Sequence, residues 1–384
     1  MAAGTSASAP LWAGFTALIN QRGQSNNLGT LGFVNPAFYL IAKGPSYASS
    51  FNDPVSGSNP STTPGTPRTH FATTGYDLVT GLGTPNCGLI ATLTNQRSSS
   101  TSPGQAVHGG VLHMAYLANN SSNTLLHIAS TDGVNWGSES QTGGVASAAT
   151  PALVSFGTLL HMFYIANDGT GALLHSTSPD GISWTQAGTV AGHASKAAPA
   201  AAVFGGAIHL TYIANNSTNQ LLHVASSDGV NWGTESQVPG QSSKFGPTLI
   251  VFSNKLWMFF TANDSSNKIY RVTSTNGTTW TTNVSVNNDT TKFAPSATVL
   301  SGVMRVAFIA NDATNRILID RSSTGTSWTR AGVGSPERTS KAAPSALSFN
   351  GGLRLSYLSN NSSNLLMRSS SANGVTNWSA ETVW

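Results

Sequence analysis

The sequence has little cysteine, little charge and no long apolar run, and each shortage excludes a way of building or placing a protein. Its single cysteine, Cys87, cannot form a disulfide within the chain. Asp, Glu, Lys and Arg make up only 8% of the 384 residues. No apolar stretch approaches the length of a membrane span, and the N-terminal residues lack the features of a secretory signal. We therefore expect a fold held by packing and hydrogen bonds, with no membrane span and no signal peptide in this sequence.

The few charges are unevenly distributed along the chain. Residues 98–195 contain four acidic residues and no Lys or Arg, whereas residues 196–384 contain 14 basic and 8 acidic residues. No basic run resembles the stripe that follows a nucleic-acid backbone, so we do not expect DNA or RNA as a partner. Ser, Thr, Asn, Gly and Ala dominate, which suits short strands joined by polar turns. This neutral composition favours a secreted, extracellular protein.

Repetition is the strongest feature that is present. Six copies of one unit fill residues 103–384, with a step of 48 residues four times and 49 once. The copies begin at Pro103, Pro151, Pro199, Pro247, Pro295 and Pro344. Each contains four strand-like runs separated by Gly, Asn and Asp turns. A period of this length with four strands per copy predicts a mainly β fold, a six-bladed β-propeller over residues 98–384.

The two ends of the repeat array determine how the ring closes. Gly104–His108 of the first copy departs most from an ordinary first strand, and the last copy ends with its fourth strand at Trp384. No extra strand is evident that would close the ring by exchange. We therefore expect the first blade to close the ring by packing against the sixth.

A turn of the form Ser-x-Asp-Gly-x-x-Trp links the third and fourth strands. It is complete in three copies, at residues 130–136, 178–184 and 226–232. The last three copies carry other residues in place of the Asp: Asn276, Thr324 and Asn373. Asp accepts backbone N–H bonds in such a turn, Gly permits a positive φ, and Trp fills space between blades. The motif resembles a shortened Asp-box of sialidase-type and lectin-like propellers, and we expect its role to be structural.

The opposite end of each blade carries two repeated polar features. Turns alternate between the two ends of a meander, so the turn between strands two and three shares an end with the link to the next blade. We call this end the link face. An Asn begins its turn in every copy: Asn119, Asn167, Asn215, Asn263, Asn311 and Asn360. A Lys precedes the blade in four copies: Lys196, Lys244, Lys292 and Lys341.

These ten residues are our candidate ligand-binding residues. Amide and ammonium groups around an aromatic floor suit the recognition of sugar hydroxyls. An aromatic residue shares one register of strand two: Tyr116, Tyr164, Tyr212, Phe260, Phe308 and Tyr357. The alternative interpretation is that Asn simply favours hairpin turns and that these rings pack inside the blades.

Histidine and arginine also repeat in register. His113, His161 and His209 share a register of strand two with Arg305 and Arg354, and His127, His175 and His223 share a register of strand three. Equivalent positions on different blades are usually too far apart for one metal ion, so we favour polar packing or contacts with a ligand. The two arginines favour anion binding. No two acids break the repeat together in neighbouring blades, as the active site of a glycosidase would require.

Residues 1–97 lack the repeat and form a separate segment. Ser8 and Pro10 predict the start of a helix whose apolar face includes Trp12 and Phe15. A second helix is expected at Pro36–Ala42, and residues 44–75 are expected to form an extended loop.

The same segment carries motifs of a known family. The run Gly4-Thr5-Ser6-Ala7-Ser8-Ala9-Pro10 resembles the motif around the nucleophile of the sedolisin family of serine-carboxyl peptidases, which have a subtilisin-like α/β fold. Residues 33–42, 51–53 and 75–85 follow in the order of that family. The resemblance covers residues 4–95, which correspond to the C-terminal part of that catalytic domain.

The resemblance implies two sites. Ser6 takes the nucleophile position, and a calcium ion is implied near the end of the domain. Its implied ligands are the carboxylates of Asp53 and Asp77 and the carbonyl oxygens of Pro54, Thr73 and Gly75, an oxygen-rich set that suits calcium. The alternative is that both aspartates cap turns. The family's activating acids lie upstream of the Ser6 motif, and a hydroxyl without a base is a weak nucleophile, so we expect no peptidase activity unless those residues are supplied.

Three functions remain open at this stage. The leading hypothesis is a secreted propeller that binds carbohydrate or another surface, joined to an incomplete sedolisin-type segment whose partner is the missing upstream part of the domain. The second is an enzyme, either a glycosidase built on the propeller or a completed peptidase. The third is a scaffold for protein interaction.

Overall fold

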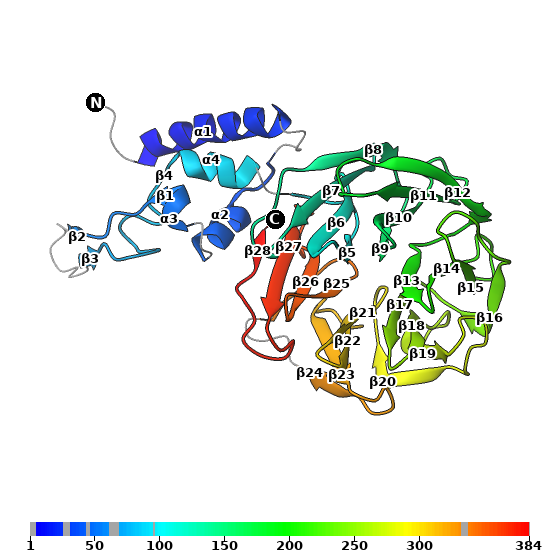
Figure 1. Ribbon diagram of the computed structural model, residues 1–384. Helices are drawn as coiled ribbons and strands as arrows, with labels where there is room; N and C mark the ends of the chain where they lie inside the picture. Colours follow the sequence, from blue (N-terminus) through cyan, green and yellow to red (C-terminus); the bar gives the residue numbers. More distant parts are fainter. Residues whose placement is uncertain are drawn as a thin grey trace. The chain divides into compact units, whose positions relative to one another are not determined.

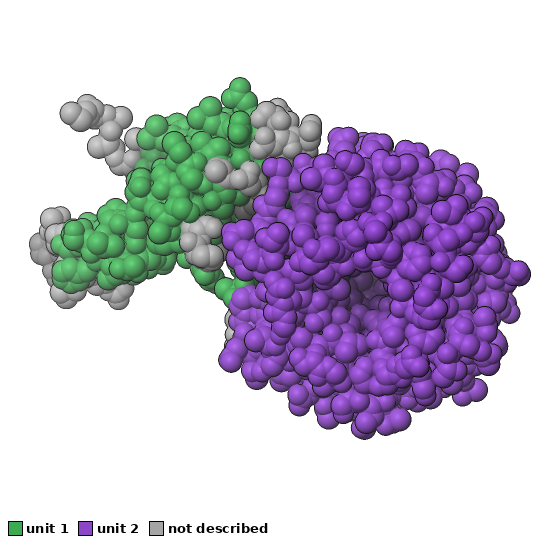
Figure 2. Space-filling model, viewed as in Figure 1, with its two compact units in different colours: residues 1–97, 380–384 green, residues 98–379 purple. Residues whose placement is uncertain are grey.

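The chain folds into two compact units, residues 1–97 with 380–384 and residues 98–379 (Figure 2). The computed structural model describes residues 5–25, 31–43, 47–60, 69–94, 97–331 and 337–383. In those ranges, no helix is long and apolar enough to cross a membrane.

The described part of the first unit combines helices with two small antiparallel sheets. The helices are α1 (Thr5–Ser25), α2 (Asn35–Ala42), α3 (Tyr47–Ser50) and α4 (Cys87–Thr94). The sheets are β1 (Phe51–Asn52) with β4 (Thr84–Pro85), and β2 (Ser58–Pro60) with β3 (Thr69–Phe71). Apolar side chains from the helices and β1 form one core: Ile19, Phe38, Ile41, Phe51, Leu89 and Leu93.

Two sequence predictions for this unit are corrected by the structure. The helix α1 begins at Thr5, so Ser8 lies within the helix instead of capping it and Pro10 is in its interior. The expected loop over residues 44–75 contains α3 and the short strands β1, β2 and β3. The second predicted helix is confirmed as α2. Strands this short lack the alternating pattern that would have shown them in the sequence.

Six four-stranded antiparallel sheets follow in the arrangement of a β-propeller, one for each sequence copy (Figure 1). The first three blades are β5 (Gly104–His108), β6 (Val111–Leu117), β7 (Thr124–Ser130) and β8 (Ser140–Ala146); β9 (Ala152–Phe156), β10 (Leu159–Ile165), β11 (Ala172–Ser178) and β12 (Thr185–Ala194); and β13 (Ala200–Phe204), β14 (Ala207–Ile213), β15 (Gln220–Ser226) and β16 (Ser236–Ser242).

The last three blades are β17 (Thr248–Phe252), β18 (Lys255–Thr261), β19 (Lys268–Ser274) and β20 (Val284–Thr290); β21 (Ser296–Leu300), β22 (Val303–Ile309), β23 (Ile317–Ser322) and β24 (Thr329–Ala331); and β25 (Ser345–Phe349), β26 (Gly352–Leu358), β27 (Leu366–Ser371) and β28 (Thr382–Val383). Strands pair with their neighbours in chain order, so each blade is a meander. The first strands of the blades lie around the centre of the ring (Figure 1). The predicted fold class is confirmed.

The core of the propeller lies between blades. Strand two is packed on both faces, so its residues are buried almost without interruption, as in Ile208–Ile213 of β14. One apolar cluster joins Phe163 of β10 to Leu210 and Tyr212 of β14, and other clusters join other pairs of neighbours. Burial between repeats explains why a single copy would not be stable alone.

A left-handed residue in the turn between strands two and three connects each blade to the next. Five of these residues are Asn and one is Gly, all with positive φ: Asn123, Gly171, Asn219, Asn267, Asn315 and Asn364. The carbonyl oxygen of Asn219 accepts the N–H of Ser243 at 2.9 Å, and that of Asn267 accepts the N–H of Thr291 at 2.9 Å. Asn is the non-glycine residue that adopts this conformation most readily.

Ring closure uses the same bond and not packing alone, which corrects the sequence prediction. The N–H of Ser99 donates to the carbonyl oxygen of Asn364 at 3.0 Å, and Ser98 forms a β-bridge with Leu365. Residues 98–99 thus add backbone pairing to the sixth blade. Gly104–His108 forms an ordinary first strand, and Gly104 is required because a Cβ there would lie 2.1 Å from the carbonyl oxygen of Pro151.

The turn between strands three and four contacts the preceding blade. In the third blade, Asp228 accepts N–H bonds from Val230 and Asn231 at 2.8 and 2.7 Å. Gly229 has a φ of +75°, and a Cβ there would lie 2.6 Å from the His161 ring of the second blade. Asp therefore shapes the turn, and Gly allows it to approach the neighbouring blade.

Candidate functional site

Lysines and asparagines of the link face form hydrogen-bonded chains that cross from one blade to the next. Lys196 Nζ donates to Asn219 Oδ1 at 2.9 Å, and Asn219 Nδ2 donates to Asn263 Oδ1 of the fourth blade at 2.9 Å. In the same way Lys292 donates to Asn315 at 2.6 Å, and Asn315 donates to Asn360 at 2.9 Å. The candidate lysines and asparagines are joined through the left-handed turn asparagine, which sequence reasoning did not single out.

The other two candidate lysines have similar partners. Lys244 Nζ donates to Asn267 Oδ1 at 2.9 Å, and Lys341 Nζ donates to the carbonyl oxygen of Asn361 at 2.9 Å. In all four cases the ammonium group is held by an uncharged oxygen. The lysines are therefore positioned, while two of the three N–H donors of each ammonium remain for other partners.

The remaining turn asparagines also contact neighbouring blades. Asn119 Oδ1 accepts a hydrogen bond from Asn364 Nδ2 at 2.7 Å across the junction of the first and sixth blades. Asn167 and Asn215 donate to carbonyl oxygens in the turn of the preceding blade, at 3.3 and 2.9 Å. Asn311 is exposed at the equivalent position of the fifth blade. The link face is thus a ring of six exposed asparagines, five of which are held by hydrogen bonds between blades.

The expected aromatic floor is absent from this face. The six aromatic side chains of strand two are at most 2% exposed, so none can cover a sugar ring. They pack between blades, which was the alternative interpretation of the register. The prediction was wrong because every position of strand two recurs once per repeat. An exposed aromatic residue and a buried one therefore show the same spacing in the sequence.

Three histidine pairs lie within single blades. His113 Nδ1 is 3.0 Å from His127 Nε2, and the pairs His161–His175 and His209–His223 are each 2.9 Å apart. All six rings are buried. The described ranges contain no group of three or more His, Cys, Asp or Glu residues placed to hold a metal ion, and each histidine pair is a buried polar contact within its blade.

The two strand-two arginines also take part in packing. Arg305 is 5% exposed, and its Nη2 donates to the carbonyl oxygen of Asn373 in the turn of the sixth blade at 3.0 Å. A Cβ on Gly133 would lie 3.1 Å from Arg354 Nε, so Arg354 contacts the turn of the first blade. These contacts hold blades together, while Arg305 Nε and Arg354 Nε are buried without a hydrogen-bond partner among the described atoms, and anion binding by the two arginines stays a prediction.

Charged residues gather where the fourth strand of one blade meets the next blade, a contact we call the seam. Between the second and third blades, His193 Nδ1 is 3.1 Å from Glu235 Oε2, which also accepts the hydroxyl of Tyr212. Burial and this carboxylate raise the pKa of Tyr212. The seam therefore keeps Tyr212 as a neutral donor.

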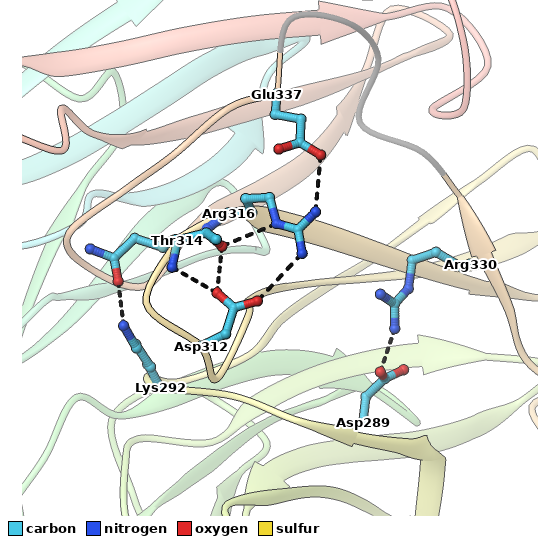
Figure 3. Close-up of polar contacts among 8 residues, drawn as sticks. Asp289, Lys292, Asp312, Thr314, Arg316, Arg330 and Glu337 are labelled. Atoms are coloured by element: carbon cyan, nitrogen blue, oxygen red, sulfur yellow. Dashed lines mark hydrogen bonds and ion pairs between the residues drawn. The ribbon is translucent and has the colours of Figure 1, made fainter.

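Between the fourth and fifth blades, two acids break the repeat together, contrary to the sequence prediction. Arg330 Nε donates to Asp320 Oδ1 at 2.6 Å. Figure 3 shows the second contact of this guanidinium, between Nη2 and Asp289 of the fourth blade. Asp320 is completely buried. Burial, followed by the hydrogen bond with Asp289, raises the pKa of Asp320 to about 7. Because the guanidinium of Arg330 binds both carboxyl groups, the cluster is a structural ion network.

The centre of the ring is neutral. Figure 2 shows a hollow at the centre of the second unit. The six first strands, all within the described ranges, contain no Asp, Glu, Lys or Arg. Gln105 Nε2 donates to Ser345 Oγ at 2.8 Å, and His108 Nδ1 is 2.8 Å from Ser155 Oγ. These strands supply no carboxyl pair for glycoside hydrolysis.

The loop that was predicted to bind calcium brings Asp53 and Asp77 to the same backbone segment. Asp53 Oδ2 accepts the N–H of Gly75 at 2.7 Å, and Asp77 Oδ2 accepts that of Thr73 at 3.0 Å. Asp77 Oδ1 accepts the N–H of Thr80 at 2.6 Å. The bonds from Thr80 and Thr73 lower the pKa of Asp77 to about 2. Asp53 Oδ1 is buried without a hydrogen-bond partner among the described atoms.

That unpartnered oxygen is compatible with a cation beside Asp53. Asp77 already accepts several N–H groups, as the turn-capping alternative predicts. The carbonyl oxygens of Thr73 and Gly75 would come from the same segment, and that of Pro54 from the residue directly after Asp53.

Ser6, the residue at the nucleophile position, falls in the first turn of α1, and the structure does not describe its side chain.

The fold is a six-bladed β-propeller that is similar to those of solved lectins. A variant of the Aleuria aurantia lectin in complex with Fucalpha1-6GlcNAc matches 75% of this chain and 97% of its own, with a TM-score of 0.55 and 16% identity. AofleA from Arthrobotrys oligospora matches 75% of this chain and 86% of its own, with a TM-score of 0.58 and 13% identity. These similarities establish the fold, and no protein-family model matches the chain.

A short segment also matches curated peptidases. Tripeptidyl-peptidase sed1 of Aspergillus fumigatus is 44% identical over 84 residues, which is 22% of this chain and 12% of that protein. Tripeptidyl-peptidase SED4 of Arthroderma otae is 38% identical over 104 residues, which is 24% of this chain and 16% of that protein. The chain thus spans less than a fifth of the length of these relatives.

Proposed function

We propose that the propeller is a secreted glycan-binding module. The observation that carries the proposal is the repeated set of exposed amide and ammonium groups on the link face, held in place by hydrogen bonds between blades. Amides donate and accept at once, as sugar hydroxyl pairs require. Several equivalent sites on one ring would raise the avidity for a polymer above the affinity of each site.

The glycosidase alternative has less support. Glycoside hydrolysis needs two carboxyl groups about 5–10 Å apart on either side of the scissile bond. The first strands contain no acid, and the carboxyl pair at the seam is occupied by Arg330. The turn aspartates that resemble an Asp-box accept backbone N–H groups, as a structural role requires.

A glycan array with the full chain tests the proposed function. We expect binding to at least one class of glycan, because the link-face amides are exposed and oriented. An Asn215→Ala/Asn263→Ala variant is expected to lose part of this binding. The matched control, Asn231→Ala/Asn276→Ala, changes two asparagines at the opposite end of the blades and is expected to bind as before. Absence of any bound glycan for the folded chain, or an equal loss in both variants, would refute the proposal.

We also propose that residues 1–97 are the C-terminal part of a sedolisin-type domain. Its support is the identity of a short segment to tripeptidyl-peptidases. Leu11, Leu18 and Phe33 are 74%, 55% and 81% exposed, a surface that the rest of such a domain would cover. In this proposal Ser6 acts as a nucleophile only with that upstream part as partner, because the hydroxyl needs a base.

Calcium binding beside Asp53 is part of the same proposal. Calcium is expected to raise the melting temperature of the first unit, because a ligand that binds only the folded state stabilises it. The effect should be lost in Asp53→Asn, which removes a charge from the buried oxygen, and kept in Asp132→Asn of the propeller. Calorimetry with and without calcium measures this, and identical melting curves for the unaltered chain would contradict it.

A further inference from the structure

Four link-face lysines occupy one position on four consecutive blades. They are Lys196, Lys244, Lys292 and Lys341, and the first two blades have Ser100 and Ala148 instead. Lys196 and Lys244 are exposed, and Lys292 and Lys341 are partly exposed. In the part of the chain that the structure describes, none of the four ammonium groups forms an ion pair. Burial lowers the pKa of Lys341, as expected for an ammonium without a facing carboxylate.

A nearby arginine shows what a neutralised cation looks like on the same face. Arg316 is held by Asp312 at 3.4 Å and by Glu337 at 3.0 Å, whereas Lys292 in the same view is held only by an amide oxygen (Figure 3). Among the described residues no carboxylate lies within ion-pair distance of the four lysines, although Asp264 and Asp312 belong to the turns that bind Lys244 and Lys292. Residues 196–384 contain 14 basic and 8 acidic residues, so the surrounding blades add to this positive potential.

The spacing of the lysines fits an extended ligand. One lysine on each of four consecutive blades gives an arc of four charges. The hydrogen-bonded chains Lys196–Asn219–Asn263 and Lys292–Asn315–Asn360 join the turns of neighbouring blades. Exposed amides lie between the charges. A polymer that repeats an anionic group and carries hydroxyls on every residue would match both features.

We propose that this arc binds a linear acidic polysaccharide through its carboxylate or sulfate groups. The proposal rests on the proposed glycan-binding function and specifies the class of glycan. Two free N–H donors on each ammonium bind the anion, and the neighbouring amides bind hydroxyls. Single-stranded nucleic acid fits the face less well, because the strand-two aromatic rings are buried and cannot stack with bases.

The test measures binding of polygalacturonate to the full chain and to a Lys196→Gln/Lys244→Gln/Lys292→Gln/Lys341→Gln variant. Glutamine keeps an N–H donor for the asparagine oxygen, so the link face should stay folded. We expect the variant to bind about tenfold more weakly or worse, and to lose the dependence of affinity on salt concentration that charge contacts produce. A Lys43→Gln/Lys255→Gln control removes exposed lysines elsewhere and is expected to bind as the unaltered chain does.

Two outcomes in which polygalacturonate binds would overturn the proposal. One is unchanged affinity of the folded four-lysine variant for polygalacturonate. The other is equal or tighter binding of a DNA duplex of matched charge, which would show a general polyanion surface. If polygalacturonate does not bind but neutral glycans on the array do, the acidic-glycan proposal fails and the glycan-binding function stands. If no glycan of either kind binds, both fail.

Discussion

Lowering the pH from about 7 to about 4 is expected to destabilise the propeller strongly, because three buried histidine pairs must remain neutral. Burial, followed by the neighbouring imidazole, lowers the pKa of His127 to about 3 and that of His223 to about 4. Burial likewise lowers the pKa of His175 to about 3. In the unfolded chain these groups bind protons near pH 6.5. Below that pH the unfolded state binds more protons, so the free energy of unfolding falls as the pH falls.

The slope can be measured from urea-induced unfolding followed by tryptophan fluorescence between pH 4 and pH 7. Each histidine that stays neutral in the folded state contributes a loss of up to about 1.4 kcal/mol per pH unit. A His127→Gln/His175→Gln/His223→Gln variant should show a much flatter dependence, since glutamine does not titrate. A triple variant as acid-sensitive as the unaltered chain would contradict this account.

Asp320, at the seam between the fourth and fifth blades, works in the opposite direction. The pKa of Asp320 is raised to about 7, so between about pH 4 and pH 7 the folded state binds one more proton than the unfolded state. This group therefore favours folding as the pH falls. One aspartate opposes three or more histidines, so the net effect remains acid destabilisation. An Asp320→Asn variant should lose stability more steeply in acid than the unaltered chain.

Gly277→Ala is expected to cost the propeller about 3 kcal/mol or more. Its φ is +80°, a left-handed conformation that costs other residues about 1–2 kcal/mol. The added Cβ would also lie 2.2 Å from Cε1 of His209 in the preceding blade. Overpacking of this kind adds about 1–3 kcal/mol. Denaturant unfolding measures the total.

Gly302→Ala separates the two contributions. Gly302 has a φ of +71°, but nothing lies within 4 Å of the position a Cβ would take. This variant should therefore show only the conformational cost, about 1–2 kcal/mol. The difference between the two variants measures how tightly the turn of one blade packs on the next. Equal costs would show that the turn can move away, and that it does not position neighbouring blades.

Much of the fold follows from local patterns that each copy repeats. The Gly, Asn and Asp turns mark the strand ends, and the number of copies predicts the number of blades. The position of Lys196 and Asn263 on one face follows from the alternation of turns in a meander. Their connection through Asn219 could not be foreseen, because Asn219 looks like any turn residue until the backbone shows its left-handed conformation and its reach to the next blade.

The seam escaped prediction for a different reason. Arg330 and Glu235 occupy equivalent positions in their blades. Each directly precedes the residue of strand four that pairs with the centre of strand three. Yet Arg330 lies 35 residues after Pro295, whereas Glu235 lies 36 residues after Pro199. Counting along the repeat therefore misaligns them. Asp289, which pairs with Arg330, belongs to the preceding blade. The repeat pattern of the sequence does not indicate which residues of two blades are in contact. Burial of the strand-two aromatic rings was similarly undecided by spacing alone.

The number of sites per chain tests the central claim most directly. The claim is that a repeated, pre-oriented link face binds glycans at several equivalent positions. Isothermal titration of the full chain with a short oligosaccharide from the best glycan on the array gives this number. The account predicts more than one bound oligosaccharide per chain. A single site, or no binding by a folded chain, would contradict it.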